Sequence, residues 1–206
     1  MKSIEKAIFG WLFQYAVIIS VIIQRFHGRK KEGIMKALVV IDIQNMLIRM
    51  KPYESTRFLQ RVGILIEQAR KKGIEVIYVR HKSDSLVPGT KDWQIHEAVA
   101  PKEGEKIIEK TYPSSFKDTD FDTYLKDKGI DNLILVGMQV EYCVDTTIRV
   151  AFEKNYKITV PQGGTTTFDT KNMPAANICV HHEKIWDRIF GRVLPIEEVL
   201  SFMDEK

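Results

Sequence analysis

The chain has 206 residues, of which 31 are basic and 27 acidic, and its formal net charge is +4. Residues 1–32 hold six basic and two acidic residues, so this segment carries the whole excess. A nucleic-acid-binding domain usually shows a basic face within its folded part, and the neutral remainder gives no sign of one. Two cysteines, Cys143 and Cys179, supply neither a disulfide framework nor a zinc motif, which suits a reducing compartment such as the cytoplasm.

The amino-terminal segment has an uncharged, mostly apolar run from Ala7 to Ile23. At about 1.5 Å per residue, roughly 17 helical residues just cross a thin bilayer core. Two interpretations stay open for residues 1–34. One is a membrane anchor that leaves the main domain in the cytoplasm, because more basic residues follow the run than precede it. The other is an upstream-translated extension of a protein that begins at Met35. A signal peptide is disfavoured, since no small-x-small cleavage site follows the run.

Residues 35–206 read as one domain in which short apolar runs alternate with helical patterns. Buried strands are predicted over Ala37–Ile43, Ile74–Val79, Lys106–Glu109, Asn132–Val136 and Lys157–Val160. Helices are predicted from a cap at Ser55 or Thr56 to Gly73, over Phe121–Lys128, after Cys143, over Ala175–Phe190 and over Pro195–Met203. This alternation indicates an α/β fold with a mostly parallel sheet covered by helices on both faces.

Cys143 lies where the predicted strand Asn132–Val136 gives way to a helix. Unpaired N–H groups and the helix dipole stabilise a thiolate at such a position, and we therefore expect a lowered thiol pKa. A thiolate is the form of cysteine that acts as a nucleophile. A small buried cysteine that fills a turn is the alternative that position alone leaves open.

Asp42 and Lys110 follow two other predicted strands. In open parallel sheets, ligands bind at the carboxyl ends of the strands, so both side chains are expected near Cys143. A carboxylate can accept the thiol proton, and an ammonium group favours the charged forms of both neighbours. Taken singly, Asp42 can merely cap a turn and Lys110 can be an ordinary solvated lysine.

Three ordered motifs carry a resemblance to a known family. They are Asp42-x-Gln44-Asn45, Lys110 followed by Ser114-x-Phe116, and Gly137-Met-Gln-x-Glu-Tyr-Cys143-Val-x-x-Thr. Together they resemble the isochorismatase-like cysteine hydrolases, in their amidohydrolase branch, over about residues 35–195.

The resemblance implies a three-layer Rossmann-like fold and a catalytic triad of Asp42, Lys110 and Cys143. Cys143 would attack a carbonyl or imino carbon, Asp42 would carry the proton, and Lys110 would stabilise the pair. The resemblance also implies a cis peptide bond between Met138 and Gln139, which would direct the N–H groups of Gln139 and Cys143 at a developing oxyanion.

The sequence departs from two branches of that family. The nicotinamidase-like branch carries the motif Asp-x-His-Pro-x-x-His after the second strand, where it forms a metal site. This chain instead has His81-Lys-Ser-Asp84 there, and His96 lies downstream. We interpret this segment as a solvated loop and expect neither a metal nor another cofactor. Enzymes that hydrolyse the vinyl ether of isochorismate typically lack the nucleophilic cysteine, so the presence of Cys143 disfavours that activity.

The sequence therefore predicts a metal-independent cysteine hydrolase of a small amide, ureide or related C–N substrate. Trp93, Phe116 and Tyr142 are candidates for the pocket lining, and Gln44 is a further substrate-binding candidate that either orients Lys110 or caps the first helix. The loop from His81 to Pro101 is expected to select the substrate. The chain is also expected to form a homo-oligomer, with His181-His182 structural or at a subunit contact. A thiol-redox protein and a non-catalytic interaction module are the competing classes.

Overall fold

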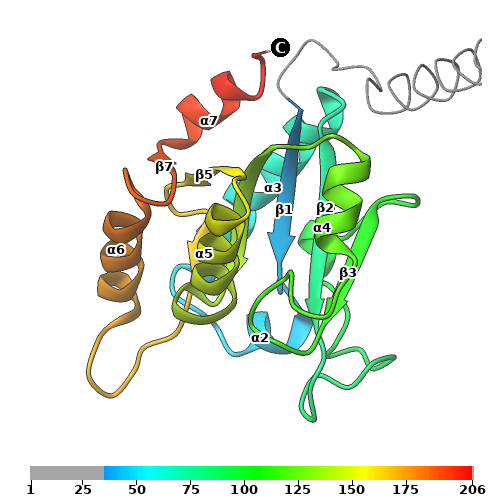
Figure 1. The fold of residues 1–206 in the computed structure, drawn as a ribbon. Helices are drawn as coiled ribbons and strands as arrows, with labels where there is room; N and C mark the ends of the chain where they lie inside the picture. The colour runs from blue at the N-terminus through cyan, green and yellow to red at the C-terminus, as the bar shows by residue number, and fades with distance from the viewer. Residues whose placement is uncertain (1–34, 206) are drawn as a thin grey trace, which may run out of the picture. The chain divides into compact units, whose positions relative to one another are not determined.

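The computed structural model describes residues 35–205, so the expectations for residues 1–34 concern a segment outside this range. Seven strands of the described chain form one sheet in the order β3-β2-β1-β4-β5-β7, with β6 paired to β4 (Figure 1). Every strand pair is parallel, which confirms the predicted sheet type. The strands are β1 (Lys36–Ile41), β2 (Glu75–His81), β3 (Lys106–Lys110), β4 (Asn132–Met138), β5 (Lys157–Pro161), β6 (Thr165–Thr166) and β7 (Arg192–Leu194).

Two hydrophobic cores fill the spaces between the sheet and two layers of helices. The helices are α2 (Asn45–Arg49), α3 (Ser55–Lys71), α4 (Phe121–Asp127), α5 (Asp145–Glu153), α6 (Ala175–Trp186) and α7 (Ile196–Phe202), with a 3-10 turn η1 (Glu97–Val99) and a π-helical turn η2 (Val140–Val144). One core joins α4, α5 and α6 to the sheet, and the other joins α3 and α7. Figure 1 shows α4 and α5 in front of the sheet and α3 behind it. The three-layer architecture is therefore confirmed.

Strand β1 shows why the apolar runs of this sequence are continuous rather than alternating. Val39 and Ile41 face the core of α4 and α5, whereas Leu38 and Val40 face the core of α3. All six residues of β1 are buried, because a central parallel strand has no solvent-exposed face.

Several elements differ from the prediction. Helix α2 and strand β6 were not predicted, because each is too short to show a hydrophobic period. Helix α3 begins after Glu54, which has a left-handed backbone with φ of 48°, and Ser55 is its first helical residue rather than its cap. The turn before Ser55 already uses that residue's N–H, which donates to the carbonyl of Pro52 at 3.1 Å.

Helix α6 ends at Trp186, four residues before the predicted end at Phe190. The chain turns back through Arg188, whose φ is 74°, and then pairs β7 with β5. At Gly191 a Cβ atom would lie 2.6 Å from the carbonyl oxygen of Ile158, so the backbone packs directly on the neighbouring strand. Pairing with the sheet edge therefore ends the helix earlier than the apolar period suggests.

Gly137 permits the closest approach of the two central strands. It is the register partner of Ile41, and a Cβ atom on Gly137 would lie 2.1 Å from the carbonyl oxygen of Ile41. Its φ of 135° is also a conformation that glycine adopts readily. The contact brings the residues that follow β1 beside the residues that follow β4, at the carboxyl edge of the sheet.

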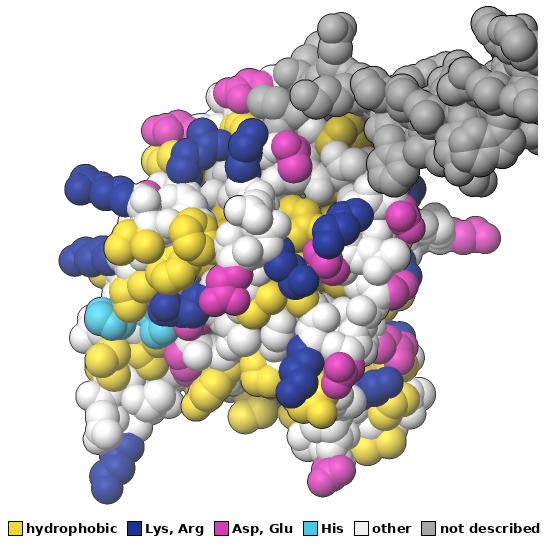
Figure 2. Space-filling view, in the orientation of Figure 1, with side chains coloured by type: hydrophobic (Ala, Val, Ile, Leu, Met, Phe, Trp, Pro, Cys, Tyr) yellow, Lys and Arg dark blue, Asp and Glu magenta, His cyan; other side chains and the backbone are white. Residues whose placement is uncertain are grey.

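The surface of the described domain mixes both signs of charge. On the face drawn in Figure 2, basic and acidic side chains lie interspersed among apolar ones. Within residues 35–205, no helix is both long and apolar enough to cross a membrane.

Candidate active site

Asp42, Lys110 and Cys143 converge at the carboxyl edge of the sheet. The Lys110 Nζ atom lies 2.6 Å from Oδ2 of Asp42 and 3.1 Å from Sγ of Cys143. The side chains of Lys110 and Asp42 are 0% and 2% exposed, so this ion pair is fully buried. The structure therefore brings together the three side chains that the sequence motifs single out.

Asp42 directly follows β1 and has a left-handed backbone with φ of 53°. Its N–H donates to the carbonyl of Val79, and its own carbonyl accepts from the N–H of Gln44, both at 2.9 Å. Left-handed non-glycine residues are uncommon, and aspartate tolerates this conformation better than most residues. One carboxylate oxygen, Oδ1, is buried without a hydrogen-bond partner among the described residues, and it remains available as an acceptor.

Lys110 ends β3 and is the register partner of His81 at the end of β2. Register partners on neighbouring parallel strands point to the same face of a sheet. The Nζ atom of Lys110 accordingly lies 3.1 Å from Nδ1 of His81. The interpretation of His81 as part of a solvated loop was wrong, since its imidazole is half-buried inside the candidate site.

Cys143 belongs to the π-helical turn η2, which follows β4 and leads into α5. The peptide bond between Met138 and Gln139, at the start of this turn, is cis. Cys143 is partly buried, in contrast to the other cysteine of the chain.

The expectation of a lowered thiol pKa was wrong. The pKa of Cys143 is raised to about 12, chiefly by burial and also by the charge of Asp42, while Lys110 opposes both effects. The free-energy cost of removing a thiolate from water exceeds the stabilisation that the turn at the end of β4 provides. The thiol is consequently protonated at neutral pH, and attack by its sulfur requires a base that takes the proton.

Gln44 ties the end of β1 to the end of β2. Its amide oxygen accepts from the N–H of His81 at 3.0 Å, and its amide nitrogen donates to the carbonyls of His81 and Trp93 at 2.9 and 2.8 Å. It is the N-cap residue of α2, but its side chain makes no capping hydrogen bond. The fully buried amide is therefore engaged by backbone groups, and its direct contact is with the backbone of His81 rather than with Lys110.

The three aromatic residues predicted to line the pocket lie in different environments. Trp93 is buried beneath the guanidinium of Arg80, 3.3 Å from the ring centroid, and its indole N–H has no partner among the described residues. Tyr142 is 56% exposed. Phe116 is buried in the core, where its ring packs 4.8 Å from the ring of Phe121. The roles of all three in substrate binding stay predictions.

Asp42, His81 and Cys143 also offer the ligand types of a metal site. One carboxylate oxygen, one imidazole nitrogen and one sulfur lie within 4.8 Å of one another. These are ligands that zinc accepts. The Lys110 ammonium lies within 3.1 Å of an atom of each of them, so a positive charge already stands where a metal ion would bind.

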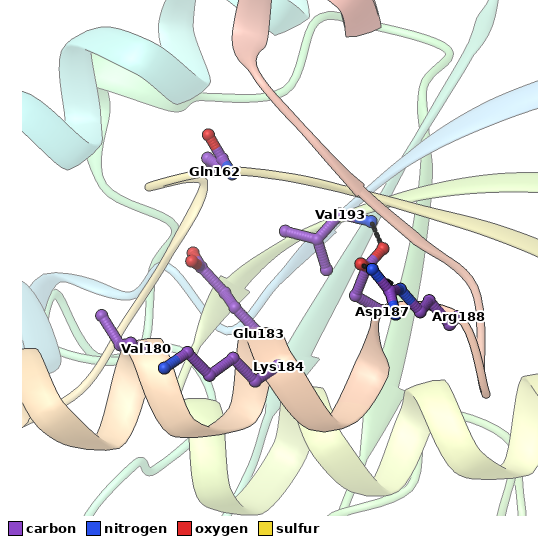
Figure 3. A pocket seen from close by; sticks show the side chains of 7 residues that line it. All are labelled: Gln162, Val180, Glu183, Lys184, Asp187, Arg188 and Val193. Carbon is purple, nitrogen blue, oxygen red and sulfur yellow. Dashed lines mark hydrogen bonds and ion pairs between the residues drawn. The ribbon is translucent and has the colours of Figure 1, made fainter.

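A pocket of about 460 Å³ lies elsewhere, beside the carboxyl-terminal half of α6 (Figure 3). It is lined by Gln162, Val180, Glu183, Lys184, Asp187, Arg188 and Val193, none of which belongs to the cluster around Lys110. Two acidic and two basic side chains are among its lining residues, and the carboxylate of Asp187 accepts from the backbone N–H of Val193. Cavity size alone therefore does not locate the chemistry of this protein.

The fold and the buried cluster together define a parallel α/β protein with an Asp–Lys–Cys site at the carboxyl edge of its sheet. Residues 36–181 match the family described as Isochorismatase domain. The chain belongs to the isochorismatase family and is a hydrolase of that family.

Individual relatives agree with this assignment. The chain is 33% identical over 154 residues to an uncharacterized isochorismatase family protein, YddQ, of Bacillus subtilis, covering 69% of this chain and 86% of the relative. It is 29% identical to a streptothricin hydrolase of Streptomyces noursei, over 69% of this chain and 52% of the relative. It is 27% identical to the ureidoacrylate amidohydrolase RutB of Rhizobium rhizogenes, over 58% of this chain and 65% of the relative.

A solved structure supports the same fold. The crystal structure of an isochorismatase family protein superimposes with a TM-score of 0.75 at 31% identity, and it covers 77% of this chain and 97% of that chain.

Proposed function

We propose that this protein hydrolyses a C–N bond of a small amide or ureide through a covalent intermediate on Cys143. The observation that carries the proposal is the position of Lys110 Nζ, which lies within hydrogen-bond distance of both the Asp42 carboxylate and the Cys143 sulfur. A buried nucleophile, a base and a fixed positive charge are the components that acyl transfer requires.

The proposed first half-reaction forms a thioester. As the sulfur of Cys143 bonds to the carbonyl carbon, the thiol proton passes to Asp42, whose Oδ1 has no other partner among the described residues. The carbonyl oxygen becomes an oxyanion, which we assign to the N–H groups of Gln139 and Cys143. When the C–N bond breaks, protonated Asp42 gives the proton to the leaving nitrogen.

The second half-reaction regenerates the thiol. A water molecule attacks the thioester carbon and gives a proton to Asp42, and the oxyanion collapses with rupture of the C–S bond. The proton then returns from Asp42 to the sulfur. Throughout the cycle the Lys110 ammonium stabilises whichever neighbour is negative, the Asp42 carboxylate or the Cys143 sulfur.

Two observations favour a C–N bond over a vinyl ether. The raised thiol pKa means that attack and deprotonation occur together, and the carboxylic acid formed on Asp42 is then the proton donor that a leaving amine needs. One of the relatives named above, the ureidoacrylate amidohydrolase, carries the name of an amide hydrolase. In substrate recognition we assign Trp93 the role of a donor, through its indole N–H, which has no partner among residues 35–205.

The test is release of ammonia or amine from a panel of primary amides, ureides and carbamoyl compounds. The wild type should hydrolyse at least one class, and mass spectrometry of acid-quenched reactions should detect an acyl group on the peptide that contains Cys143. The matched control is Cys179→Ala, which keeps every residue of the proposed site. Full activity in a Cys143→Ala protein would rule out the covalent mechanism.

A homo-oligomer and membrane contact through residues 7–23 stay predictions, and neither is needed for the mechanism proposed here.

A further inference from the structure

The Lys110 ammonium has one more hydrogen than the two that it directs at Asp42 Oδ2 and Cys143 Sγ. An ammonium group carries three N–H donors and no acceptor. Asp42 Oδ2 and Cys143 Sγ receive two of them, and within the described part of the chain the third polar neighbour of Nζ is Nδ1 of His81, at 3.1 Å. With the Lys110 side chain fully buried, no solvent competes for that third hydrogen.

This contact determines the state of the imidazole. Because Lys110 only donates, Nδ1 of His81 must accept, and it must therefore be unprotonated. The hydrogen of the neutral ring is consequently on Nε2. Burial and the charge of Lys110 both lower the pKa of His81, and Asp42 opposes them, so the neutral form is favoured near pH 7.

The orientation of His81 is also fixed from its backbone. The side chain of Gln44 bonds both the N–H and the carbonyl of His81, and pairing of β2 with β3 places His81 in register with Lys110. The titratable groups that face the imidazole come from three elements, which are Lys110 on β3, Asp42 after β1 and Cys143 in η2. A proton on Nδ1 would place the positive charge of the His81 imidazolium against the buried ammonium of Lys110.

We propose that His81 is a positioning residue of the proposed cysteine hydrolase, whose neutral Nδ1 accepts the third hydrogen of Lys110 and holds the ammonium between Asp42 and Cys143. The inference rests on the proposed function and adds a residue to that site. Protonation of His81 breaks this contact, so His81 sets the acidic limb of the pH–activity profile.

Two substitutions separate positioning from mere packing. His81→Asn can retain an acceptor near the position of Nδ1 but cannot be protonated in this pH range. His81→Leu fills similar space and removes the acceptor. We expect His81→Leu to lower kcat/KM, and the rate of Cys143 alkylation by iodoacetamide, by roughly 10- to 100-fold, because a buried N–H of Lys110 loses its partner. His81→Asn should stay within a few-fold of the wild type and should lose the acidic limb. The exposed His181→Asn is the matched control and should change neither rate.

A spectroscopic measurement tests the contact even if His81→Leu fails to fold. In the full-length protein labelled with ¹⁵N at histidine, Nδ1 of His81 should give the shift of an unprotonated ring nitrogen at pH 7, and Nε2 that of a protonated one. The opposite tautomer would overturn the proposal, as would wild-type rates and an unchanged pH profile in both His81 variants.

Failure of the proposed function is a separate outcome. Alkylation of Cys143 and the imidazole shifts are measured without an amide substrate. If Cys143→Ala retained full hydrolysis, the hydrolytic mechanism would fall, while these two measurements would still decide whether His81 positions Lys110.

Discussion

Cys143 and Cys179 both have a thiol pKa above its ordinary value, but they differ in their charged neighbours and in their accessibility. Burial raises the pKa of both thiols to about 12. Around Cys143 the ammonium of Lys110 lies 3.1 Å from the sulfur and the carboxylate of Asp42 is ready to take a proton. The charged neighbours that shift the pKa of Cys179 are all carboxylates, Glu183, Glu141 and Glu54, and each disfavours a thiolate.

The surroundings of Cys179 also lack the access that a nucleophile needs. Cys179 is buried on α6 and lines a pocket of only about 140 Å³. Burial likewise raises the pKa of the neighbouring Glu183, although the N–H of Gly163 and the charge of Arg61 partly offset it. The comparison shows that a cysteine of this fold becomes a nucleophile through its partners, since the pKa of the thiol does not distinguish the two sites.

The largest expected effect contrasts the two cysteines directly. Cys143→Ala should lower turnover on the order of 10⁴-fold or more, because no thioester can form. Cys179→Ala should leave turnover within a few-fold and cost about 1 kcal/mol of stability through a small cavity. Steady-state kinetics and urea unfolding of both variants check this pair. Loss of activity in Cys179→Ala with a stable fold would mean that the second thiol takes part.

Asp42→Asn removes the base while nearly preserving its shape. Turnover should fall by about 10²- to 10⁴-fold, the usual contribution of general acid–base catalysis. Alkylation of Cys143 near pH 7 should slow as well, because burial alone keeps the thiol pKa raised and the protonated thiol loses the base that takes its proton. Parallel assays of turnover and alkylation measure both rates. Unchanged or faster alkylation in Asp42→Asn would remove Asp42 from the role of base.

Lys110→Met tests the ion pair as a structural element. Removing one partner leaves the Asp42 carboxylate buried without a counter-charge, and we expect a loss of about 3–5 kcal/mol in the free energy of unfolding. The double variant Lys110→Met/Asp42→Asn should recover part of this loss, since no buried charge then remains. Urea unfolding measures both values, and the exposed Lys126→Met provides a surface control. Equal stability of the two variants would show that the buried carboxylate is protonated or solvated.

Both cysteines should contribute in the same direction to the pH dependence of stability. Both thiols have a raised pKa in the folded state, from an ordinary value of 9.0. Above about pH 9 the unfolded chain therefore releases protons that the folded chain keeps, and stability falls as the pH rises. Cys143→Ala and Cys179→Ala should each reduce this alkaline loss, as thermal unfolding between pH 8 and 11 would show. An unchanged slope in one variant would mean that its thiol is already ionised in the folded protein.

The smallest expected effect concerns metals. Treatment with a chelator should leave turnover unchanged, because the Lys110 ammonium holds the place at which Asp42, His81 and Cys143 would ligate an ion. Kinetics before and after dialysis against the chelator measure this. Inactivation that a divalent metal reverses would show that a metal ion displaces the Lys110 ammonium from this position.

The sequence by itself determined which strands carry the site and which residues stand at their carboxyl ends. Continuous apolar runs predicted strands buried on both faces, and parallel strands deliver their carboxyl-terminal residues to one edge. Asp42, Lys110 and Cys143 were thus predictable, because each follows or ends a strand in an identifiable motif.

The features that depend on strand order and packing were decided only by the tertiary structure. The pairing of β2 with β3 brings His81 to Lys110, a contact between residues 29 apart that no local pattern contains. The direction of the thiol pKa depends on how deeply Cys143 is buried and on its distance from Asp42, and it reverses the expectation drawn from the helix end alone. Helix α6 stops at Trp186 because β7 pairs with β5. Local sequence specifies which groups stand at the ends of the strands, whereas burial and long-range pairing set their protonation and their partners.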